Sequence, residues 1–118
     1  MIEFICDYKT KIDRRAILQL DYADLISDEQ YFCIKINGNI FYEQPLFPIL
    51  EFLFAYLIWD KKHNFIFNTI ESEENPMIVF KHTLRGWKLD SVWKKFDCLA
   101  VFNLNEIVYG IEKMIDNF

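Results

Sequence analysis

The 118-residue chain contains few residues that break regular structure, with only three glycines and three prolines. This scarcity, together with the lack of any polar tract, argues against flexible linkers and low-complexity tails. The length fits one hydrophobic core, because independent domains usually hold roughly 100 to 150 residues. We therefore expect a single domain over residues 1–118 without an internal boundary.

Cysteine is also scarce, and its three positions follow neither a CxxC pattern nor a Cys/His ligand spacing: Cys6, Cys33 and Cys98. Neither a disulfide framework nor a zinc site is indicated, and a reducing cytoplasm is the expected compartment. The three glycines are isolated from one another, so no glycine-rich loop is available to bind a phosphate group. The sequence therefore implies no metal and no cofactor.

Long hydrophobic runs are lacking as well. The longest apolar segment, residues 46–59, is interrupted by Pro48 and Glu51 and is shorter than the roughly 20 residues that span a bilayer. Glu3 stands where a secretory signal would carry a basic residue. We therefore expect neither membrane insertion nor export.

Basic residues are outnumbered, with 13 Lys and Arg against 18 Asp and Glu, which gives a net charge of −5. A negative chain repels phosphate backbones, so nucleic acid is not an expected partner. The same charge suits a basic protein partner, although it also serves solubility alone. Aromatic residues are abundant, with 12 Phe, 6 Tyr and 3 Trp, and supply ample surface for a core.

Alternating apolar residues predict isolated strands in three places. Residues 1–8 alternate clearly, and residues 65–70 read as a strand that leads into an acidic loop. Residues 15–22 also alternate, although Leu18 and Tyr22 would share one stripe of a helix. We favour a strand for residues 15–22 and keep the helix as the alternative.

A first hairpin is predicted around Asn37-Gly38, which links the apolar residues 31–36 to residues 40–43. This dipeptide is the one that best tolerates positive φ in a type I′ turn. Two antiparallel strands are therefore expected on either side of it.

A second hairpin is predicted across Arg85-Gly86, between residues 77–84 and 87–93. A two-residue loop at that point places Lys81 opposite Asp90, which is a favourable cross-strand pair. In this register one face of the hairpin is mainly apolar, and we expect that face to look inward.

Two helices are expected. The first covers residues 47–59 and starts near Phe47, because Pro45 and Pro48 are tolerated at a helix start. It is apolar almost all the way round, which is typical of a helix covered on most sides. The second begins at Asn103, which can form a capping box with Glu106 ahead of an apolar stripe. The overall prediction is an α+β fold in which a mostly antiparallel sheet of five or six strands packs against both helices.

Two groups of polar residues are candidates for a site. Glu71, Glu73 and Glu74 form an acidic loop that can contact a basic partner, or can simply be solvated. Glu51, an acid inside the apolar helix, and His82 beside Trp87 can supply the polar groups of a small pocket.

Both groups also have purely structural explanations. Glu51 fits the first turn of its helix, where a carboxylate interacts favourably with the helix dipole. His82, Ser91 and a nearby aspartate are weak grounds for a catalytic triad, because no nucleophile elbow or oxyanion loop accompanies them. We therefore do not expect an enzyme.

From Tyr31 onward the sequence carries a distinctive series of motifs: Ile36-Asn37-Gly38, Pro45-Leu46-Phe47-Pro48 before Glu51-Phe52, Trp59, Glu74-Asn75-Pro76, and Gly86-Trp87-Lys88-Leu89-Asp90-Ser91. This series resembles small uncharacterised proteins, domains of unknown function, from Gram-positive bacteria. Those proteins are in turn similar to immunity proteins of bacterial polymorphic toxin systems. The resemblance implies a cytoplasmic protein that binds and blocks a cognate toxin, and it assigns no catalytic residue.

Three functional hypotheses follow. The first is a non-catalytic protein-binding module of the immunity-protein kind, which uses Glu71, Glu73 and Glu74. The alternative is a small-ligand-binding domain or modest enzyme with a pocket near Glu51, His82 and Trp87. A homodimer built through a strand edge or an aromatic patch is compatible with either.

Overall fold

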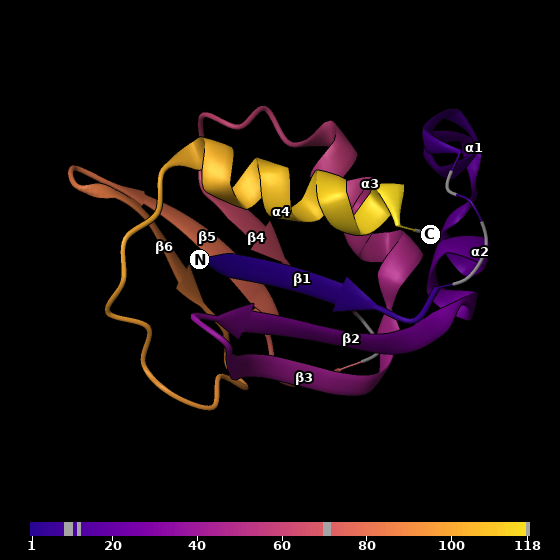
Figure 1. The fold of residues 1–118 in the computed structure, drawn as a ribbon. Coiled ribbons are helices and arrows are strands. Elements are labelled where there is room, and N and C mark those ends of the chain that lie inside the picture. Colours follow the sequence, from indigo (N-terminus) through magenta and orange to yellow (C-terminus); the bar gives the residue numbers. More distant parts are fainter. Residues whose placement is uncertain (9–10, 12, 70–71, 118) are drawn as a thin grey trace.

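The computed structural model describes residues 1–8, 11, 13–69 and 72–117. Within them the chain has the α+β architecture that the sequence predicts (Figure 1). The elements follow in the order β1 (Ile2–Cys6), α1 (Arg14–Gln19), α2 (Tyr22–Ser27), β2 (Glu29–Ile36), β3 (Asn39–Pro48), α3 (Ile49–Ile58), β4 (Phe65–Phe67), β5 (Ile78–Thr83), β6 (Gly86–Asp90) and α4 (Leu104–Asp116).

The described strands form two three-stranded antiparallel sheets, ordered β1-β2-β3 and β4-β5-β6, so the expectation of one sheet with five or six strands is wrong. β3 is an edge strand, and its Pro45 and Pro48 have no N–H with which to continue the ladder. Each sheet buries one apolar face, and the two faces pack against each other. The rings of Phe4 and Phe80, from opposite sheets, meet edge to face at 6.0 Å.

The predicted first hairpin is confirmed. Ile36 pairs with Asn39, which leaves Asn37 and Gly38 as a two-residue turn with φ of 51° and 84°. These positive φ values are those that a type I′ turn requires. The predicted strand at the start of the chain is confirmed as β1, which pairs antiparallel with β2.

The segment predicted as a strand over residues 15–22 instead contains α1 and the start of α2, so that prediction is wrong. The Asp13 side chain accepts hydrogen bonds from the backbone N–H groups of Arg15 and Ala16, and the Asp21 side chain accepts one from Asp24. These N-caps satisfy donors that a helix start leaves free. They outweigh the apolar alternation that favoured a strand.

α3 is the central apolar helix that the sequence predicts, although it begins at Ile49 with Pro48 as its N-cap residue rather than near Phe47. Its Phe52 is fully buried, and the ring lies 5.7 Å from Phe65 and 5.5 Å from Phe67 of β4. The same ring lies 5.5 Å from Phe32 of β2. α3 therefore joins the two sheets through one continuous aromatic core.

The second hairpin forms with a different register, in which Lys81 lies opposite Lys88 and the turn falls at Leu84 and Arg85. The predicted pairing of Lys81 with Asp90 is therefore wrong. Thr83 stabilises this turn, because its Oγ1 accepts a hydrogen bond from Arg85 N and donates one to Gly86 O at 2.7 Å. The register differs by two residues, so the same side chains still share one face. Phe80, Trp87 and Leu89 of that face are buried as predicted, whereas His82 and Leu84 near the turn are exposed.

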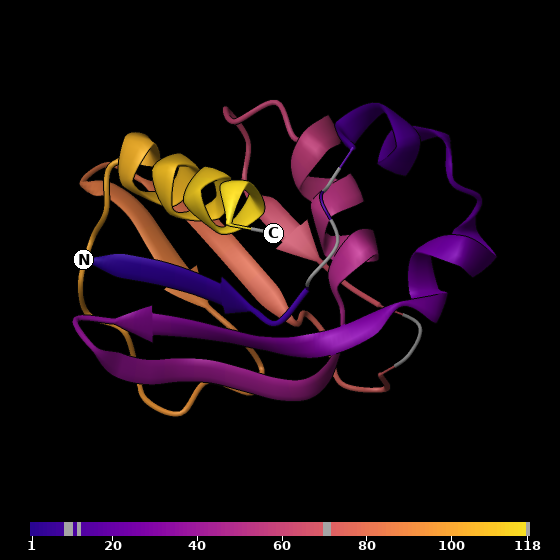
Figure 2. The ribbon, with the colours of Figure 1, turned by 45° about the vertical axis from the view of Figure 1, so that its right-hand side comes forward.

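β4 is shorter than the strand predicted over residues 65–70, since it ends at Phe67 and residue 70 lies outside the described part of the chain. α4 has the predicted capping box, with Asn103 and Glu106 each bonding the other's backbone. α4 lies along β1 at the side where the two sheets open (Figure 2). No helix in the described ranges has both the length and the apolar character to cross a membrane.

Candidate protein-binding surface

The acidic loop after β4 is held in shape by Asn75. Its side-chain oxygen accepts from Thr69 N at 3.0 Å, and its amide nitrogen donates to the carbonyls of Thr69 and Ser72 at 3.1 and 3.0 Å. Glu73 and Glu74 belong to this loop and are exposed, whereas Glu71 lies outside the described residues. The loop therefore presents two carboxylates from a fixed backbone.

Trp93 lies against this loop, although it is 19 residues further along the chain. Its indole N–H donates a hydrogen bond to the Glu74 carboxylate, and its backbone N–H donates to Ser91 Oγ at 3.0 Å. The neighbouring Val92 donates its N–H to the Pro76 carbonyl at 3.1 Å. Trp93 nevertheless keeps 41% of its surface exposed. We refer to Glu73, Glu74, Val92 and Trp93 as the acidic–aromatic surface.

The connection from β6 to α4 is anchored beyond Trp93 by contacts with the other sheet. Lys95 N donates to the Phe41 carbonyl at 2.8 Å, and the Phe96 ring meets the Phe41 ring at 5.5 Å. Lys95 Nζ also lies 3.9 Å from the Glu43 carboxylate. This connection ties β3 to β6, so Trp93 stands on a segment fixed on both sides.

Asp90 ends β6 and lies two residues before Val92 of the acidic–aromatic surface. Partial burial alone would raise the pKa of Asp90, but hydrogen bonds from Lys94 Nζ and Ser91 N, together with the charges of Lys94 and Lys81, outweigh it. The pKa of Asp90 is therefore lowered, and its carboxylate lies 2.9 Å from Lys94 Nζ. Lys94 is thus engaged by an acid instead of neutralising Glu73 or Glu74.

The residues suggested for a small pocket lie in two separate places. Glu51 is in the first turn of α3, as its structural interpretation predicts, and is only 8% exposed. His82 stacks on Trp87 with ring centroids 4.6 Å apart, and Trp87 meets Trp59 at 5.5 Å. Trp59 follows the last turn of α3, so Glu51 lies about 12 Å from that stack along the helix axis.

Glu51 has one further unusual property, since its Oε1 atom is buried and has no hydrogen-bond partner among the described residues. The hydroxyl of Tyr42 is in the same condition, and burial raises the pKa of Tyr42. Neither of the two surface hollows described below is lined by Glu51, His82 or Trp87. The geometry therefore brings His82 and Trp87 together and leaves Glu51 apart.

The weaker triad of His82, Ser91 and Asp90 is not assembled. Ser91 follows the pair formed by Asp90 and Val79, so it lies at the level of Ile78, four residues from His82 along β5. This separation is about 13 Å in a strand. Ser91 Oγ accepts from Trp93 N, so its observed role is to hold the loop.

Comparison with known proteins identifies the family. The family model described as "Domain of unknown function (DUF7878)" matches residues 2–118. The chain belongs to DUF7878. No curated protein and no solved structure shows a significant match. The resemblance to a domain of unknown function is thus confirmed, and the function must be inferred from the geometry of this DUF7878 chain.

Metal ligands do not gather in the described part of the DUF7878 chain, where no group of three His, Cys, Asp or Glu is placed to hold an ion. Cys6, Cys33 and Cys98 are all free thiols. A hollow of about 280 Å³ beside Lys81, Lys88 and Asp97 is charged and widely open.

Sequence reasoning found the acidic part of the DUF7878 surface but not its aromatic part. In the register predicted for the second hairpin, Trp93 shares the apolar face with Trp87 and Leu89, so the sequence predicts that Trp93 also points inward. β6 ends at Asp90, and the chain turns away at Ser91. The pair Asp90-Ser91, two residues that favour turns, was the available signal for that departure.

Proposed function

We propose that this DUF7878 chain is a non-catalytic module that binds a basic protein through the acidic–aromatic surface. The observation that carries this proposal is the contact between Trp93 and Glu74, which presents a half-exposed indole beside a carboxylate of the acidic loop. Tryptophan is among the residues most enriched at the energetic centres of interfaces. Adjacent acids attract a basic partner and fix its orientation.

The rigidity of this surface supports the proposal. Asn75 holds the acidic loop with three side-chain hydrogen bonds, and Ser91 and Pro76 accept from the backbone of Trp93 and Val92. A surface that is already ordered loses less conformational entropy on binding. The strongly buried aromatic core behind it provides the fixed support.

The finer part of the proposal concerns the partner. We infer that it is a cognate bacterial toxin, because the motif series from Tyr31 onward resembles immunity proteins. An immunity protein acts by occupying a surface of its toxin, which needs no catalytic residue of its own. The net charge of −5 suits a toxin whose working surface is positive.

The experiment uses the tagged protein to capture partners from a lysate of the source cells, with identification by mass spectrometry. The captured protein is then purified and titrated calorimetrically against the wild type, Trp93→Ala and Glu74→Lys. Trp93→Ala is expected to weaken binding by roughly 30-fold or more, which corresponds to about 2 kcal/mol for an interface anchor. Glu74→Lys is expected to weaken it further at low salt, since it reverses a charge and removes the acceptor of the indole N–H.

Two matched variants serve as controls. Leu99→Ala truncates another exposed apolar residue of the same connection, and Glu29→Lys reverses an exposed acid on β2. Both should bind as the wild type does. Unchanged affinity for Trp93→Ala and Glu74→Lys would exclude this surface, whereas a partner whose activity is not inhibited by the complex would exclude the immunity role alone.

A further inference from the structure

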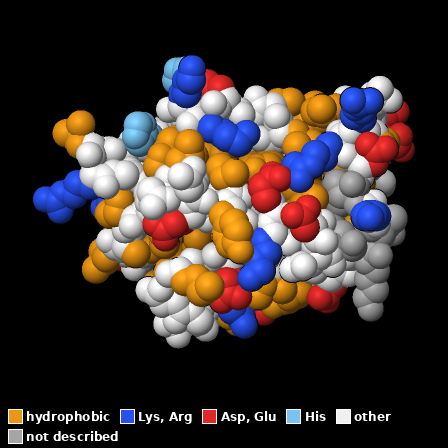
Figure 3. Space-filling view, turned by 45° about the horizontal axis from the view of Figure 1, so that its top comes forward, with side chains coloured by type: hydrophobic (Ala, Val, Ile, Leu, Met, Phe, Trp, Pro, Cys, Tyr) orange, Lys and Arg blue, Asp and Glu red, His pale blue; other side chains and the backbone are white. Residues whose placement is uncertain are grey.

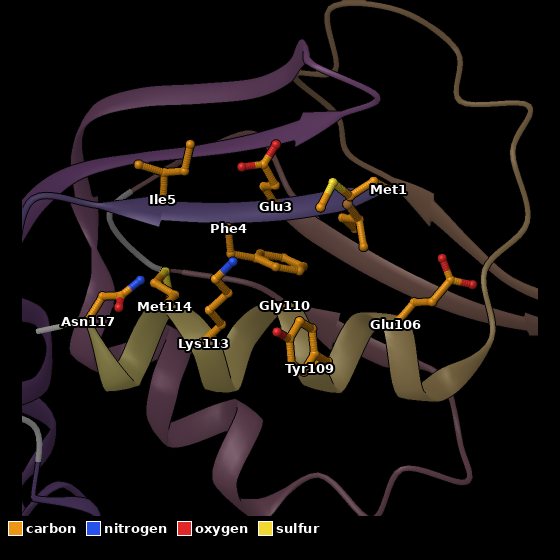
Figure 4. A pocket seen from close by; sticks show the side chains of 11 residues that line it. Met1, Glu3, Phe4, Ile5, Glu106, Tyr109, Gly110, Lys113, Met114 and Asn117 are labelled. Atoms are coloured by element: carbon orange, nitrogen blue, oxygen red, sulfur yellow. The ribbon is translucent and has the colours of Figure 1, made fainter.

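A groove of about 200 Å³ runs between β1 and α4 (Figure 4). None of the described residues that line it belongs to the acidic–aromatic surface. Its buried lining is apolar and comes from Phe4, Gly110 and Met114. Its exposed lining includes Met1 and Tyr109, which keep 72% and 66% of their surface in solvent. A hollow and a protruding aromatic side chain therefore lie next to each other.

Gly110 determines how closely α4 packs against β1. A side chain at this position would begin 2.9 Å from the Phe4 ring and 3.4 Å from the Ile2 carbonyl oxygen, so only glycine allows α4 to approach β1 this closely. The Phe4 ring occupies the space that a side chain at Gly110 would need, and the two residues together line one part of the groove. The groove is therefore bounded by the longer side chains on either side of Gly110 along α4.

The charged residues of the groove have opposite signs at opposite ends. Glu106 lies near Met1, and Lys113 lies toward the other end, with Tyr109 and Gly110 between them (Figure 4). Both are exposed, and neither forms an ion pair with another described residue. They are seven residues apart, so each lies about 5 Å along the helix axis from the midpoint between Tyr109 and Gly110.

This arrangement is complementary to itself. If two copies of α4 pack antiparallel about a two-fold axis at that midpoint, Glu106 of each copy comes level with Lys113 of the other. The same register places Tyr109 of each copy level with Gly110 of the other, beside the groove that Gly110 and Phe4 line. One register therefore pairs the opposite charges and brings each Tyr109 to the groove of the other copy. The mixture of apolar, acidic and basic side chains on this face is visible in Figure 3.

We propose that the groove between β1 and α4 is the interface of a homodimer, in which antiparallel α4 helices exchange Glu106 and Lys113 contacts and each groove receives the Tyr109 side chain of the other copy. We infer a second copy as the occupant because a two-fold axis places the acid of each copy opposite the base of the other. An unrelated peptide would have to carry the same pattern by coincidence. The interface shares no residue with the acidic–aromatic surface, so both can be occupied together.

The test measures the mass in solution by light scattering after size exclusion, over a wide concentration range. The wild type should reach twice the 14.3 kDa of one chain. Glu106→Lys and Lys113→Glu each place like charges together and should give monomers. The double variant restores opposite charges in every pair and should dimerise again. Because the two side chains are two turns apart in one helix, such rescue reports contact between copies.

The controls separate association from folding. Glu106→Lys also removes half of the capping box, so circular dichroism melts of all variants establish that they are folded. Asp116→Lys reverses an exposed acid on α4 outside the groove and should leave the dimer intact. A wild type that stays monomeric overturns the proposal, as do single variants that remain dimeric or a folded double variant that remains monomeric. None of these results bears on the proposed partner binding through Trp93.

Discussion

Arg14 of α1 donates two hydrogen bonds to the Glu112 carboxylate of α4, at 2.6 and 3.1 Å, although 98 residues separate them. Tyr56 of α3 donates a third to the same carboxylate at 2.7 Å. One acid thus joins three helices. The hydrogen bonds from Arg14 are the main cause that lowers the pKa of Glu112, against the opposing effect of burial.

The first prediction concerns Arg14→Met. Because the pKa of Glu112 is lower in the folded chain than the value of about 4.3 in an unfolded one, the ion pair contributes stability above that value and loses it as pH falls through the folded pKa. Both side chains are partly exposed, so the loss near neutral pH should be roughly 1 kcal/mol. Urea unfolding of both proteins over a pH series measures the difference.

The difference between the wild type and Arg14→Met should shrink as the pH is lowered below about 5. Arg15→Met removes the adjacent, exposed arginine of the same helix and is the matched control, with little change expected at any pH. A pH-independent difference between the wild type and Arg14→Met would show that the loss comes from packing instead of charge.

The second prediction compares two glycines with positive φ. Gly86 has φ of 133°, and a Cβ there would lie 2.8 Å from the Phe102 carbonyl oxygen, whereas Gly38 has φ of 84° and open space. Gly38→Ala carries only the backbone strain, about 1 kcal/mol. Gly86→Ala adds a clash with the backbone that bridges Trp87 to Phe102, and we expect a clearly larger loss. Denaturant midpoints compare the two, and equal losses would contradict the role assigned to Phe102.

The third prediction concerns the reactivity of Cys6. Burial raises the pKa of its thiol to about 11, and only the thiolate reacts with iodoacetamide. In the folded protein near neutral pH, alkylation of Cys6 should therefore be roughly a hundredfold slower than in urea. The alkylation rate of Cys6 should still rise between pH 9 and 10, roughly where the rate for an ordinary thiol has levelled off. Peptide mass spectrometry measures the rate, and a plateau near pH 9 would refute the raised pKa.

Local signals in the sequence predict much of the secondary structure. Asn37-Gly38 determines the first hairpin, and Asn103 with Glu106 determines the start of α4, because both act over a few residues. The caps Asp13 and Asp21 were equally local, but the alternation between them favoured a strand. The second hairpin was misplaced because Thr83 selects the turn through side-chain bonds that alternation does not encode.

The remaining features depend on residues that are distant in sequence. The six described strands form two sheets, and not one, because of how their buried faces pack. The apolar alternation of each strand in the sequence is compatible with one sheet or with two. Trp93 meets Glu74 only after the chain leaves β6, so composition indicates an acidic loop and cannot place an indole beside it. The charge symmetry of Glu106 and Lys113 is readable in the sequence, but the groove between them is not.

The contact between Gly110 and Phe4 joins the first strand to the last helix, and this has a consequence during synthesis. β1 leaves the ribosome about a hundred residues before α4 does, so Phe4 cannot contact Gly110 until α4 has also been made. The side of the aromatic core that α4 covers stays open during that time. A ribosome-bound chain that stops before residue 103 should therefore be a substrate for chaperones, whereas a chain that includes α4 covers its own core.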